Sequence, residues 1–527
     1  MIRIATLVSC LIALGAAGTA RAGTQSEFTG HRHQVFRVVV VPTLGSADLR
    51  LLAQHGAAVG LLVPNAGPRT SAADAFAGMV RGILYNTRLA RPTDSVLIHV
   101  VHARTVPLHG PAIVLDLPAD HRIANTRRYG IAVLGGGYHG ILVSRLTRVP
   151  GLVSIADVAR TALGTENRLR SARSANAPAA LVQLEARIEA ARGSTMAGSV
   201  LVLSLLVMFA LLYPAGAPAA LAAALGANLL LGWAGSADTV ANVVLLGLSL
   251  VAGGLLGPSL FRSRLALGTV LVLVLVAYGV ALATHPPALS LAPMGPELTS
   301  RFFGVSNLVE SLLLAPALLA ASLLGQRFGP AAFGAVGLLA LVIVAENRLG
   351  SDGGGALVVG FGFAVLAVGI WARRWRSTVP AIALALLAAF ALLDLDAASS
   401  SPDHLRGALH GGVQGFVRVA VHRVPLSYDR IVQQWWLLFP GLGGVLVAAI
   451  ALRLARSRRE AAPVIALLAA LATSFLVNDS PGAVAIAGLA SLLAVENGAV
   501  QRGLTMPVLR RLRLTLPAAI EPPRPQE

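Results

Sequence analysis

The 527-residue chain contains no lysine, a single cysteine and few aromatic residues. Cys10 lies in an N-terminal apolar run, so the chain beyond it has no thiol for a disulfide or a nucleophile. Aromatic residues make up 5% of the chain, and no basic soluble segment interleaves with them, which argues against nucleic-acid binding. All of the basic residues are arginines, and they outnumber the acidic residues to give a net charge of +18. Many arginines stand beside apolar segments, where they act as topology signals and contact anionic lipid headgroups.

Long apolar runs dominate the sequence. Hydrophobic residues make up 55% of the chain and charged residues 13%, and the mean hydropathy is +0.73. Repeated apolar runs of about 17–22 residues have the length of a helix that crosses a bilayer core. We therefore predict an all-α polytopic membrane bundle of about eleven spans. The expected spans lie near residues 198–214, 217–233, 238–257, 265–284, 305–323, 331–346, 355–371, 379–394, 434–452, 462–478 and 482–496.

The N-terminus has the pattern of a secretory signal peptide over residues 1–22. Arg3 precedes an apolar run at 4–17, and Ala20-Arg21-Ala22 supplies small residues for cleavage. We expect an extracytoplasmic domain over 23–195, a transmembrane domain over 196–497 and a basic cytoplasmic tail over 498–527.

The extracytoplasmic segment predicts a small α/β domain. Short apolar runs bounded by Pro, Gly and Asp predict strands at 38–42, 94–101, 112–116 and 130–134. Helical patterns lie between them at 46–55, 72–84 and 154–163. Alternating strands and helices favour a mainly parallel sheet. The stretch 166–192, rich in Ala, Arg and Glu, predicts a helical connector to the membrane.

The arginine pattern predicts the sidedness of the bundle. With the N-terminal domain outside, the basic loops all fall on the cytoplasmic side, as the positive-inside rule requires. These arginines are Arg262, Arg264, Arg327, Arg373, Arg374, Arg376, Arg453, Arg456, Arg458, Arg459, Arg502, Arg510, Arg511 and Arg513. The expected location is a bacterial inner membrane, with the C-terminus in the cytoplasm.

Three polar segments interrupt the series of apolar runs, at 301–310, 346–355 and 478–482. The predicted topology puts all three on the outer face. Candidate catalytic residues in them are Glu310, Asp352 and Asp479, and candidate substrate-binding residues are Arg301, Asn307, Arg348, Asn478 and Ser480. An acid held inside a span is costly, which favours a functional role.

Each segment also has a purely structural interpretation. Asn307 and Glu310 have capping-box spacing, with Asn in place of the usual Ser or Thr. The glycines around Asp352 can let helices pack closely, or let backbone N–H groups approach an anion. An Asp or Ser cap followed by Pro481 is also how a helix begins.

The N-terminal domain resembles a shortened alkaline-phosphatase-like domain. The similarity lies in the strand at 38–42, the segment 67–71 and the segment 147–161. Thr70 matches the nucleophile position, and Asp157 to Thr161 match a late structural segment, with Arg160 where that family has Pro. Pro42-Thr43 stands where a metal-binding Asp is expected, so the resemblance implies a degenerate, binding-only domain.

The membrane half resembles a family of bacterial multi-span proteins that carry such a domain at the N-terminus. The shared signals are Arg301 to Asn307, Gly350 to Gly354 and Asn478 to Ser480. The acid that the family has directly after the first motif is displaced here to Glu310. The resemblance implies architecture and sidedness and names no reaction.

Three functions remain open from the sequence. The first is binding of an anionic, phosphate-bearing lipid-linked substrate, such as a polyprenyl phosphate or lipid-linked saccharide, and its transport or presentation. The second is a membrane-embedded transferase or hydrolase that acts at the outer face. The third is a non-catalytic envelope scaffold that recruits a protein partner through residues 35–195. The sequence indicates membrane lipids as partners and identifies no metal site and no cofactor.

Overall fold

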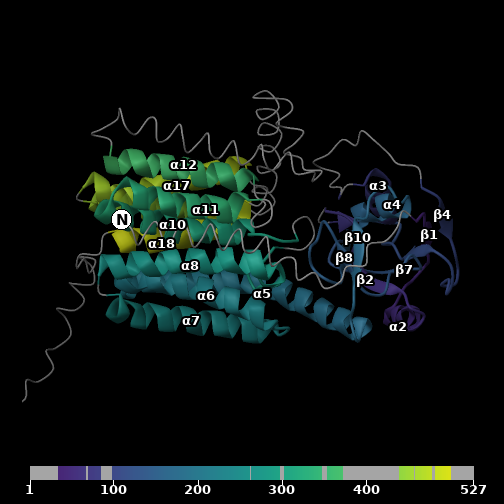
Figure 1. Cartoon of the computed structure of the whole chain (residues 1–527). Helices are drawn as coiled ribbons and strands as arrows, with labels where there is room; N and C mark the ends of the chain where they lie inside the picture. The colour runs from purple at the N-terminus through teal and green to yellow at the C-terminus, as the bar shows by residue number, and fades with distance from the viewer. Residues whose placement is uncertain are drawn as a thin grey trace, which may run out of the picture.

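The computed structural model describes residues 34–66, 69–82, 84, 98–261, 263–296, 302–346, 353–371, 438–455, 457–477 and 481–499. The predicted signal peptide, the predicted span at 379–394 and the tail from residue 500 lie outside the described residues. The described chain forms an α/β domain and a helical bundle, and one long helix joins the two (Figure 1).

The α/β domain is built on a sheet with the strand order β10-β8-β2-β7-β5-β1-β4, and β9 pairs with β2 beside this path. The strands are β1 (Arg37–Val40), β2 (Ala58–Val63), β4 (Val100–His102), β5 (Ala112–Leu115), β7 (Tyr129–Leu134), β8 (Gly140–Ser144), β9 (Leu152–Ser154) and β10 (Leu169–Ala172). A separate two-stranded ribbon pairs β3 (Arg69–Thr70) with β6 (Ile123–Ala124).

The expected mainly parallel sheet is wrong, because the sheet is mixed. β1 runs parallel to β4 and β5, and β2 runs parallel to β8 and β9. β7 is antiparallel to both of its neighbours, and β10 is antiparallel to β8. The strands β2 and β8 were not predicted, and β10 occupies the start of the expected helical connector. Between β5 and β7 the chain returns without a helix, and a return of this kind gives an antiparallel pair.

Both faces of the sheet are covered. One face packs against α3 (Ala72–Arg81) and α4 (Val158–Ala162), and the other packs against α2 (Ser46–Gln54) and the first turns of α5 (Ala177–Leu212). Alternate residues of β1 contribute to the two cores, as the two-residue period of a strand requires.

Helix α5 runs from the sheet into the bundle without a break. Leu181, Leu184 and Ile188 pack against the sheet, whereas Val202, Leu206 and Phe209 belong to the core of the bundle. Its 36 residues give a rod of about 54 Å at 1.5 Å per residue. The domain is therefore carried on a continuous helix.

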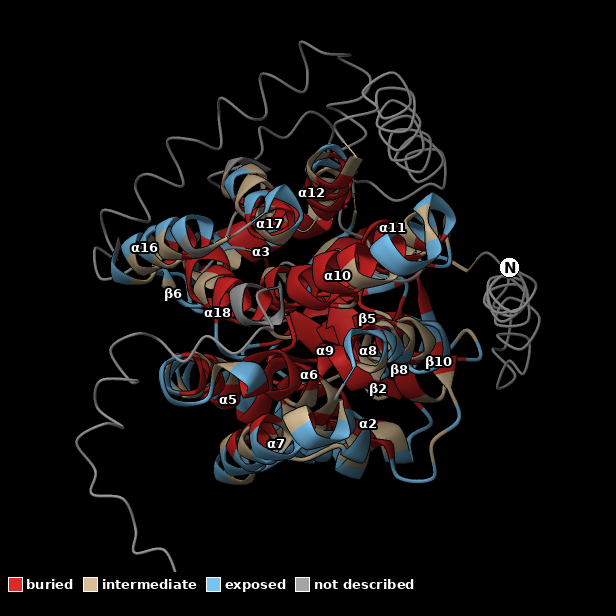
Figure 2. Cartoon of the chain, turned by 90° about the vertical axis from the view of Figure 1, so that its left-hand side faces the viewer, coloured by how far each residue is buried: buried red, intermediate tan, exposed pale blue. Residues whose placement is uncertain are grey.

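The bundle packs around α10, which lies at its centre (Figure 2). Its helices are α6 (Ala217–Ala234), α7 (Thr239–Leu260), α8 (Arg264–Thr284), α9 (Pro286–Ser290), α10 (Asn307–Phe328), α11 (Pro330–Ala345), α12 (Gly353–Trp371), α16 (Leu438–Leu454), α17 (Arg458–Val477) and α18 (Pro481–Ala499). The candidate span of α10 is 89% buried, whereas those of α5 and α7 are 33% buried. Large apolar side chains on the outer helices are exposed, as for helices that face lipid.

The expectation of about eleven spans is corrected by the structure. The described part of the chain holds six helices long and apolar enough to cross a membrane: 177–212, 214–234, 239–260, 264–284, 307–328 and 354–371. Three further apolar helices are shorter, at 330–345, 439–453 and 482–495. Helix α17 begins with Arg458, Arg459 and Glu460, so charge shortens its apolar part. The chain is a multi-pass membrane protein by helix length and hydropathy.

Candidate functional site

The central helix α10 carries an acid in its first turn. Ser306 is the N-cap, and its hydroxyl accepts a hydrogen bond from the N–H of Val309 at 3.1 Å. Asn307 is therefore the first helical residue, and the capping-box interpretation of Asn307 with Glu310 is wrong. Glu310 lies one turn inside the helix, where its residue surface is 1% exposed.

The start of α10 lies at the end of the bundle that faces the α/β domain. The Ser306 hydroxyl donates to the carbonyl oxygen of Met294 at 2.8 Å. In the same segment, the Pro293 carbonyl accepts a hydrogen bond at 2.9 Å from Thr195, which lies where α5 leaves the domain. Two links thus connect the N-cap of α10 to the junction between domain and bundle.

Two phenylalanines tie the segment before α10 to the α/β domain. Phe302 is 3% exposed and belongs to the core under the sheet. The guanidinium carbon of Arg148 lies 3.8 Å from the centroid of the Phe303 ring, a cation–π contact. Within the described residues, Arg148 is the non-glycine residue with positive φ, at 56°. Such a backbone is held only where surrounding contacts require it.

The Glu310 side chain is enclosed by apolar helices. A small cavity beside it leaves about 10 Å³ for the centre of a water molecule, roughly what one water needs. The residues around this cavity are Leu275, Leu313, Leu314, Ala317, Ala340, Ile343, Val344 and Val359. A carboxyl group in such surroundings is expensive to keep in its charged form.

The second polar segment meets Glu310 directly. Glu346 caps the end of α11 and is half-buried, and α12 begins at Gly353. A Cβ atom on Gly355 would lie 2.9 Å from a Glu310 carboxyl oxygen and 2.4 Å from a methyl group of Val344. The absence of a side chain at Gly355 therefore lets α10, α11 and α12 close around the acid.

The third segment joins α17 to α18, and α18 packs on α10. The Ser491 hydroxyl donates to the carbonyl oxygen of Ser311 at 2.7 Å. Residues 478–480 themselves lie outside the described part, so of the site residues expected from sequence only Asn307 and Glu310 are placed. The remaining ones are Arg301, Arg348, Asp352, Asn478, Asp479 and Ser480.

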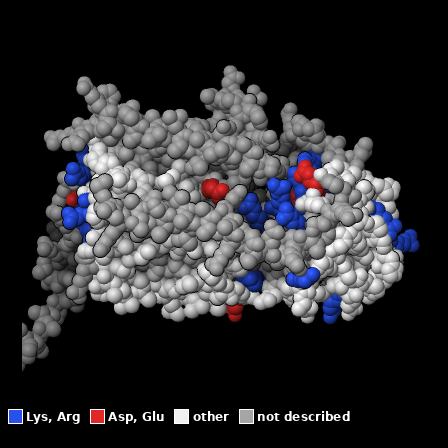
Figure 3. Space-filling model, in the orientation of Figure 1, with Lys and Arg blue, Asp and Glu red and all other residues white. Residues whose placement is uncertain are grey.

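Arginines mark both ends of the bundle. Arg264 begins α8, Arg327 lies in the last turn of α10, Arg453 in the last turn of α16, and Arg458 begins α17. These positions are at the end away from the α/β domain. On the face seen in Figure 3, described arginines lie at that far end, at the junction and on the domain.

The residues of the α/β domain that the phosphatase resemblance emphasises are buried. Thr70 is 0% exposed, and its hydroxyl has no hydrogen-bond partner among the described residues. Ser71 caps α3, and Asp74 in the next turn receives two hydrogen bonds from Arg122, at 3.2 and 3.1 Å. Across the described ranges, no group of three or more His, Cys, Asp or Glu side chains is arranged to hold a metal ion.

The late segment from Asp157 to Thr161 holds strands together. Asp157 is 0% exposed and accepts hydrogen bonds from the Ser144 hydroxyl and from the N–H of Leu146. The Thr161 hydroxyl donates to the Asp157 carbonyl at 2.7 Å and accepts from the N–H of Leu169 at 3.1 Å. Burial raises the pKa of Asp157 to about 6, although its hydrogen bonds and Arg168 act in the other direction.

Sequence reasoning missed Asp116 as a site residue. It follows β5 at the carboxyl end of two parallel strands, the edge where α/β proteins usually bind ligands. One carboxyl oxygen accepts the N–H of Leu44 at 3.3 Å, and the other has no hydrogen-bond partner in the described chain. Burial raises the pKa of Asp116 to about 6, against the effect of Leu44 and other groups. The sequence signal that could have identified Asp116 is its position directly after an apolar strand.

In comparison with known proteins, no family model, curated protein or solved structure matches the chain.

Proposed function

We propose that the protein binds an anionic, phosphate-bearing lipid-linked substrate at the domain-facing end of its bundle, and transports or presents it. The observation that carries the proposal is the burial of Glu310, 1% exposed, in the first turn of the central helix. An ionisable group held among apolar helices is expensive to keep there, and such a group is a functional candidate by default.

Two arginines, one before the start of α10 and one after the end of α11 in the sequence, suit a phosphate. Arg301 directly precedes Phe302, which is anchored under the sheet, and Arg348 lies two residues beyond Glu346 at the end of α11. Arginine binds phosphate oxygens through a planar fork of N–H donors. In this proposal Arg301, Arg348, Asn307, Asn478 and Ser480 bind the substrate, and Glu310, Asp352 and Asp479 couple to protons or a cation.

The proposed sidedness follows from charge. The described arginines at the far end of the bundle, such as Arg327 and Arg458, suit the cytoplasmic side. The α/β domain and the start of α10 then lie outside a bacterial inner membrane. A lipid-linked substrate of the cell envelope is available on that face.

The test uses purified protein in liposomes with a polyprenyl phosphate probe. We expect Arg301→Ala to lower probe binding, and Glu310→Gln to retain binding but lose flux and its pH dependence. Glu460→Gln, an acid at the opposite end of the bundle, is the matched control and should behave as the wild type. Equal binding and flux in the wild type and Arg301→Ala would rule the proposal out.

A second function, transfer or hydrolysis of a lipid-linked substrate, is favoured by one observation. Glu310 lies in the first turn of α10 rather than halfway along it, whereas transporters usually keep their site near the bilayer midplane. Here Glu310 or Asp352 acts as the general base. Turnover of a labelled substrate that is abolished by Asp352→Asn, with no flux in either protein, would favour this second function.

A further inference from the structure

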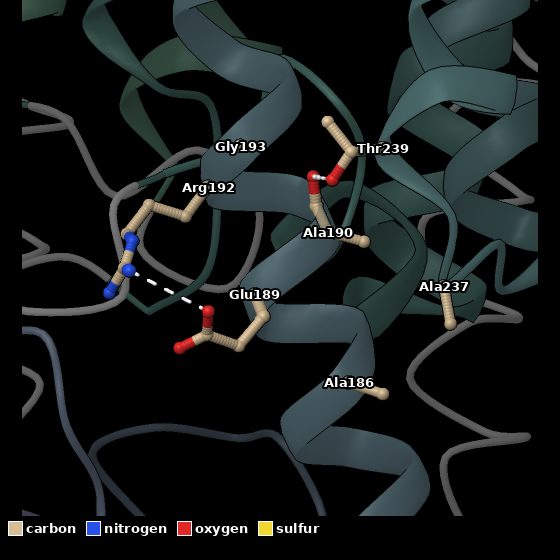
Figure 4. A pocket seen from close by; sticks show the side chains of 7 residues that line it. All are labelled: Ala186, Glu189, Ala190, Arg192, Gly193, Ala237 and Thr239. Carbon is tan, nitrogen blue, oxygen red and sulfur yellow. Dashed lines mark hydrogen bonds and ion pairs between the residues drawn. The ribbon is translucent and has the colours of Figure 1, made fainter.

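A second polar site lies where α5 leaves the domain, away from Glu310. An open groove of about 470 Å³ separates α5 from the beginning of α7. It is lined by Ala186, Glu189, Ala190, Arg192, Gly193, Ala237 and Thr239 (Figure 4). Its volume is in the range of ligand sites, roughly 300–1,000 Å³. Among the described residues that line it, the charged ones are one acid and one base.

The two charges face each other across one turn of α5. A carboxyl oxygen of Glu189 lies 3.6 Å from a guanidinium nitrogen of Arg192, and the side chains are 58% and 44% exposed (Figure 4). The other end of the Arg192 guanidinium donates to the carbonyl oxygen of Thr126 at 2.9 Å. Arg192 is therefore oriented by the α/β domain and lines one edge of the groove.

The walls of the groove are fixed by hydrogen bonds between α5 and α7. The Thr239 hydroxyl donates to the carbonyl oxygen of Ala190 at 3.4 Å. One turn further, the Asn242 amide donates to the Ser194 hydroxyl at 3.2 Å. Gly193 faces Thr239, and a Cβ there would lie 2.9 Å from the Thr239 hydroxyl oxygen. The groove is thus a built feature of the junction.

The groove lies at the boundary between polar and lipid-facing surface. Directly beyond it, α5 exposes Met196 and Val200, and α7 exposes Val240 and Val244. At the end of the neighbouring α6, Trp233 is 57% exposed. Exposed indoles are typical of the headgroup level of a membrane. The polar part of a ligand in the groove would therefore lie at headgroup depth. The exposed apolar side chains of α5 and α7 would lie next to it, on the side of the bilayer core.

We propose that the groove binds the headgroup of a zwitterionic phospholipid of the phosphatidylethanolamine type. Arg192 pairs with the phosphate, Glu189 pairs with the ammonium group, and the acyl chains run over the exposed apolar faces of α5 and α7.

Charge complementarity selects this headgroup over an anionic one. A lone anion at Arg192 would lie beside the Glu189 carboxylate, and like charges at such distances repel. The N-terminus of α7 offers little to an anion, because Asp238 already accepts the N–H groups of Val240 and Ala241 at 2.8 and 3.0 Å. A headgroup with one charge of each sign satisfies both lining residues.

Native mass spectrometry of the full-length protein with equal amounts of phosphatidylethanolamine and phosphatidylglycerol tests the proposal. We expect the wild type to retain phosphatidylethanolamine preferentially. Because both side chains are about half exposed, each pairing contributes at most about fivefold in affinity. Glu189→Gln should lower phosphatidylethanolamine binding and raise phosphatidylglycerol binding, whereas Arg192→Gln should lower both.

Two further variants separate the groove from general lipid binding. Glu185→Gln removes an acid one turn earlier on α5, outside the groove, and should leave the lipid ratio unchanged. Ala237→Trp fills the groove without changing charge and should lower both lipids. A wild-type lipid ratio in Glu189→Gln, together with wild-type amounts of both lipids in Ala237→Trp, would overturn the proposal. Equal affinity for phosphatidylethanolamine and for soluble phosphoethanolamine would also count against it, since the acyl chains would then contribute nothing.

Discussion

The contact of Gly355 with Glu310 and Val344 predicts that Gly355→Ala destabilises the bundle. The new Cβ would lie 2.4 Å from a Val344 methyl group and 2.9 Å from a Glu310 carboxyl oxygen. Val344 is 3% exposed and Glu310 is 1% exposed, so neither side chain can move into open space. Overpacking of this kind costs about 1–3 kcal/mol. The better helix propensity of alanine offsets up to about 1 kcal/mol of that cost.

The matched control is Gly334→Ala on α11, where a Cβ atom would meet nothing within 4 Å. This variant should be neutral or gain up to about 1 kcal/mol. The free energy of unfolding, measured by equilibrium SDS titration with circular dichroism, should therefore differ between the two variants by about 1–3 kcal/mol.

A double-mutant cycle identifies the contact responsible. Val344→Ala removes the methyl group that the new Cβ meets, so the double variant with Gly355→Ala should be more stable than the sum of the single effects predicts. Contacting residues show coupling of about 0.5–3 kcal/mol. If Gly355→Ala behaves like Gly334→Ala, and shows no coupling to Val344→Ala, the close approach of α12 to Glu310 is refuted.

Two other expectations concern buried polar groups. Because the pKa of Asp157 is about 6 in the folded domain and about 3.9 unfolded, the folded state binds more protons between these values. Stability should fall by up to about 3 kcal/mol as pH rises from 4 to 7, with hydrogen exchange at β8 and β9 as the measurement. Asp157→Asn should remove the part of this slope that Asp157 contributes and leave the part from Asp116, whose pKa burial also raises to about 6. A slope unchanged by Asp157→Asn would refute the assignment. Asn228→Leu leaves the N–H of Met294, now bonded at 2.7 Å, without its acceptor, and should cost about 1–3 kcal/mol. Tyr278→Phe keeps this acceptor but removes the hydroxyl that accepts from the Asn228 amide at 3.2 Å and donates to the Leu225 carbonyl at 3.0 Å. It should also cost about 1–3 kcal/mol in the same SDS titration, and no cost in either variant would contradict this explanation.

The sequence predicted the helices of the bundle better than the number of spans. Apolar length alone located α6, α7 and α8 to within a few residues. It could not separate a helix that crosses the bilayer from one of 16 residues such as α11, because both are continuous apolar runs. In the α/β domain the runs at β1 and β5 were found, and the direction of β7 was not. Strand direction depends on long-range pairing, which a local pattern does not record.

The sequence also predicted the candidate site only in part. Glu310 could be chosen as a candidate without any knowledge of the fold, because it is an acid inside an apolar run. The cap was assigned to Asn307 because spacing alone allows it, and only the hydrogen bond from the N–H of Val309 to the Ser306 hydroxyl shows that Ser306 is the cap. The role of Gly355 could not be predicted either, because the sequence does not show that the Glu310 side chain packs against this glycine.

The α/β domain is attached to the bundle at two places, and this bears on every proposed function. Helix α5 is a continuous rod, and on its own it could carry a domain that only recruits a partner. The second attachment, Phe302 and Phe303 against the domain, leads within a few residues to Ser306 and the first turn of α10. It includes Arg148 in a backbone conformation that costs about 1–3 kcal/mol. This contact couples the position of the domain to the first turn of α10. The proposed function makes use of that coupling, because it requires the domain to act together with Glu310, whereas a domain that only recruits a partner could be carried by α5 alone.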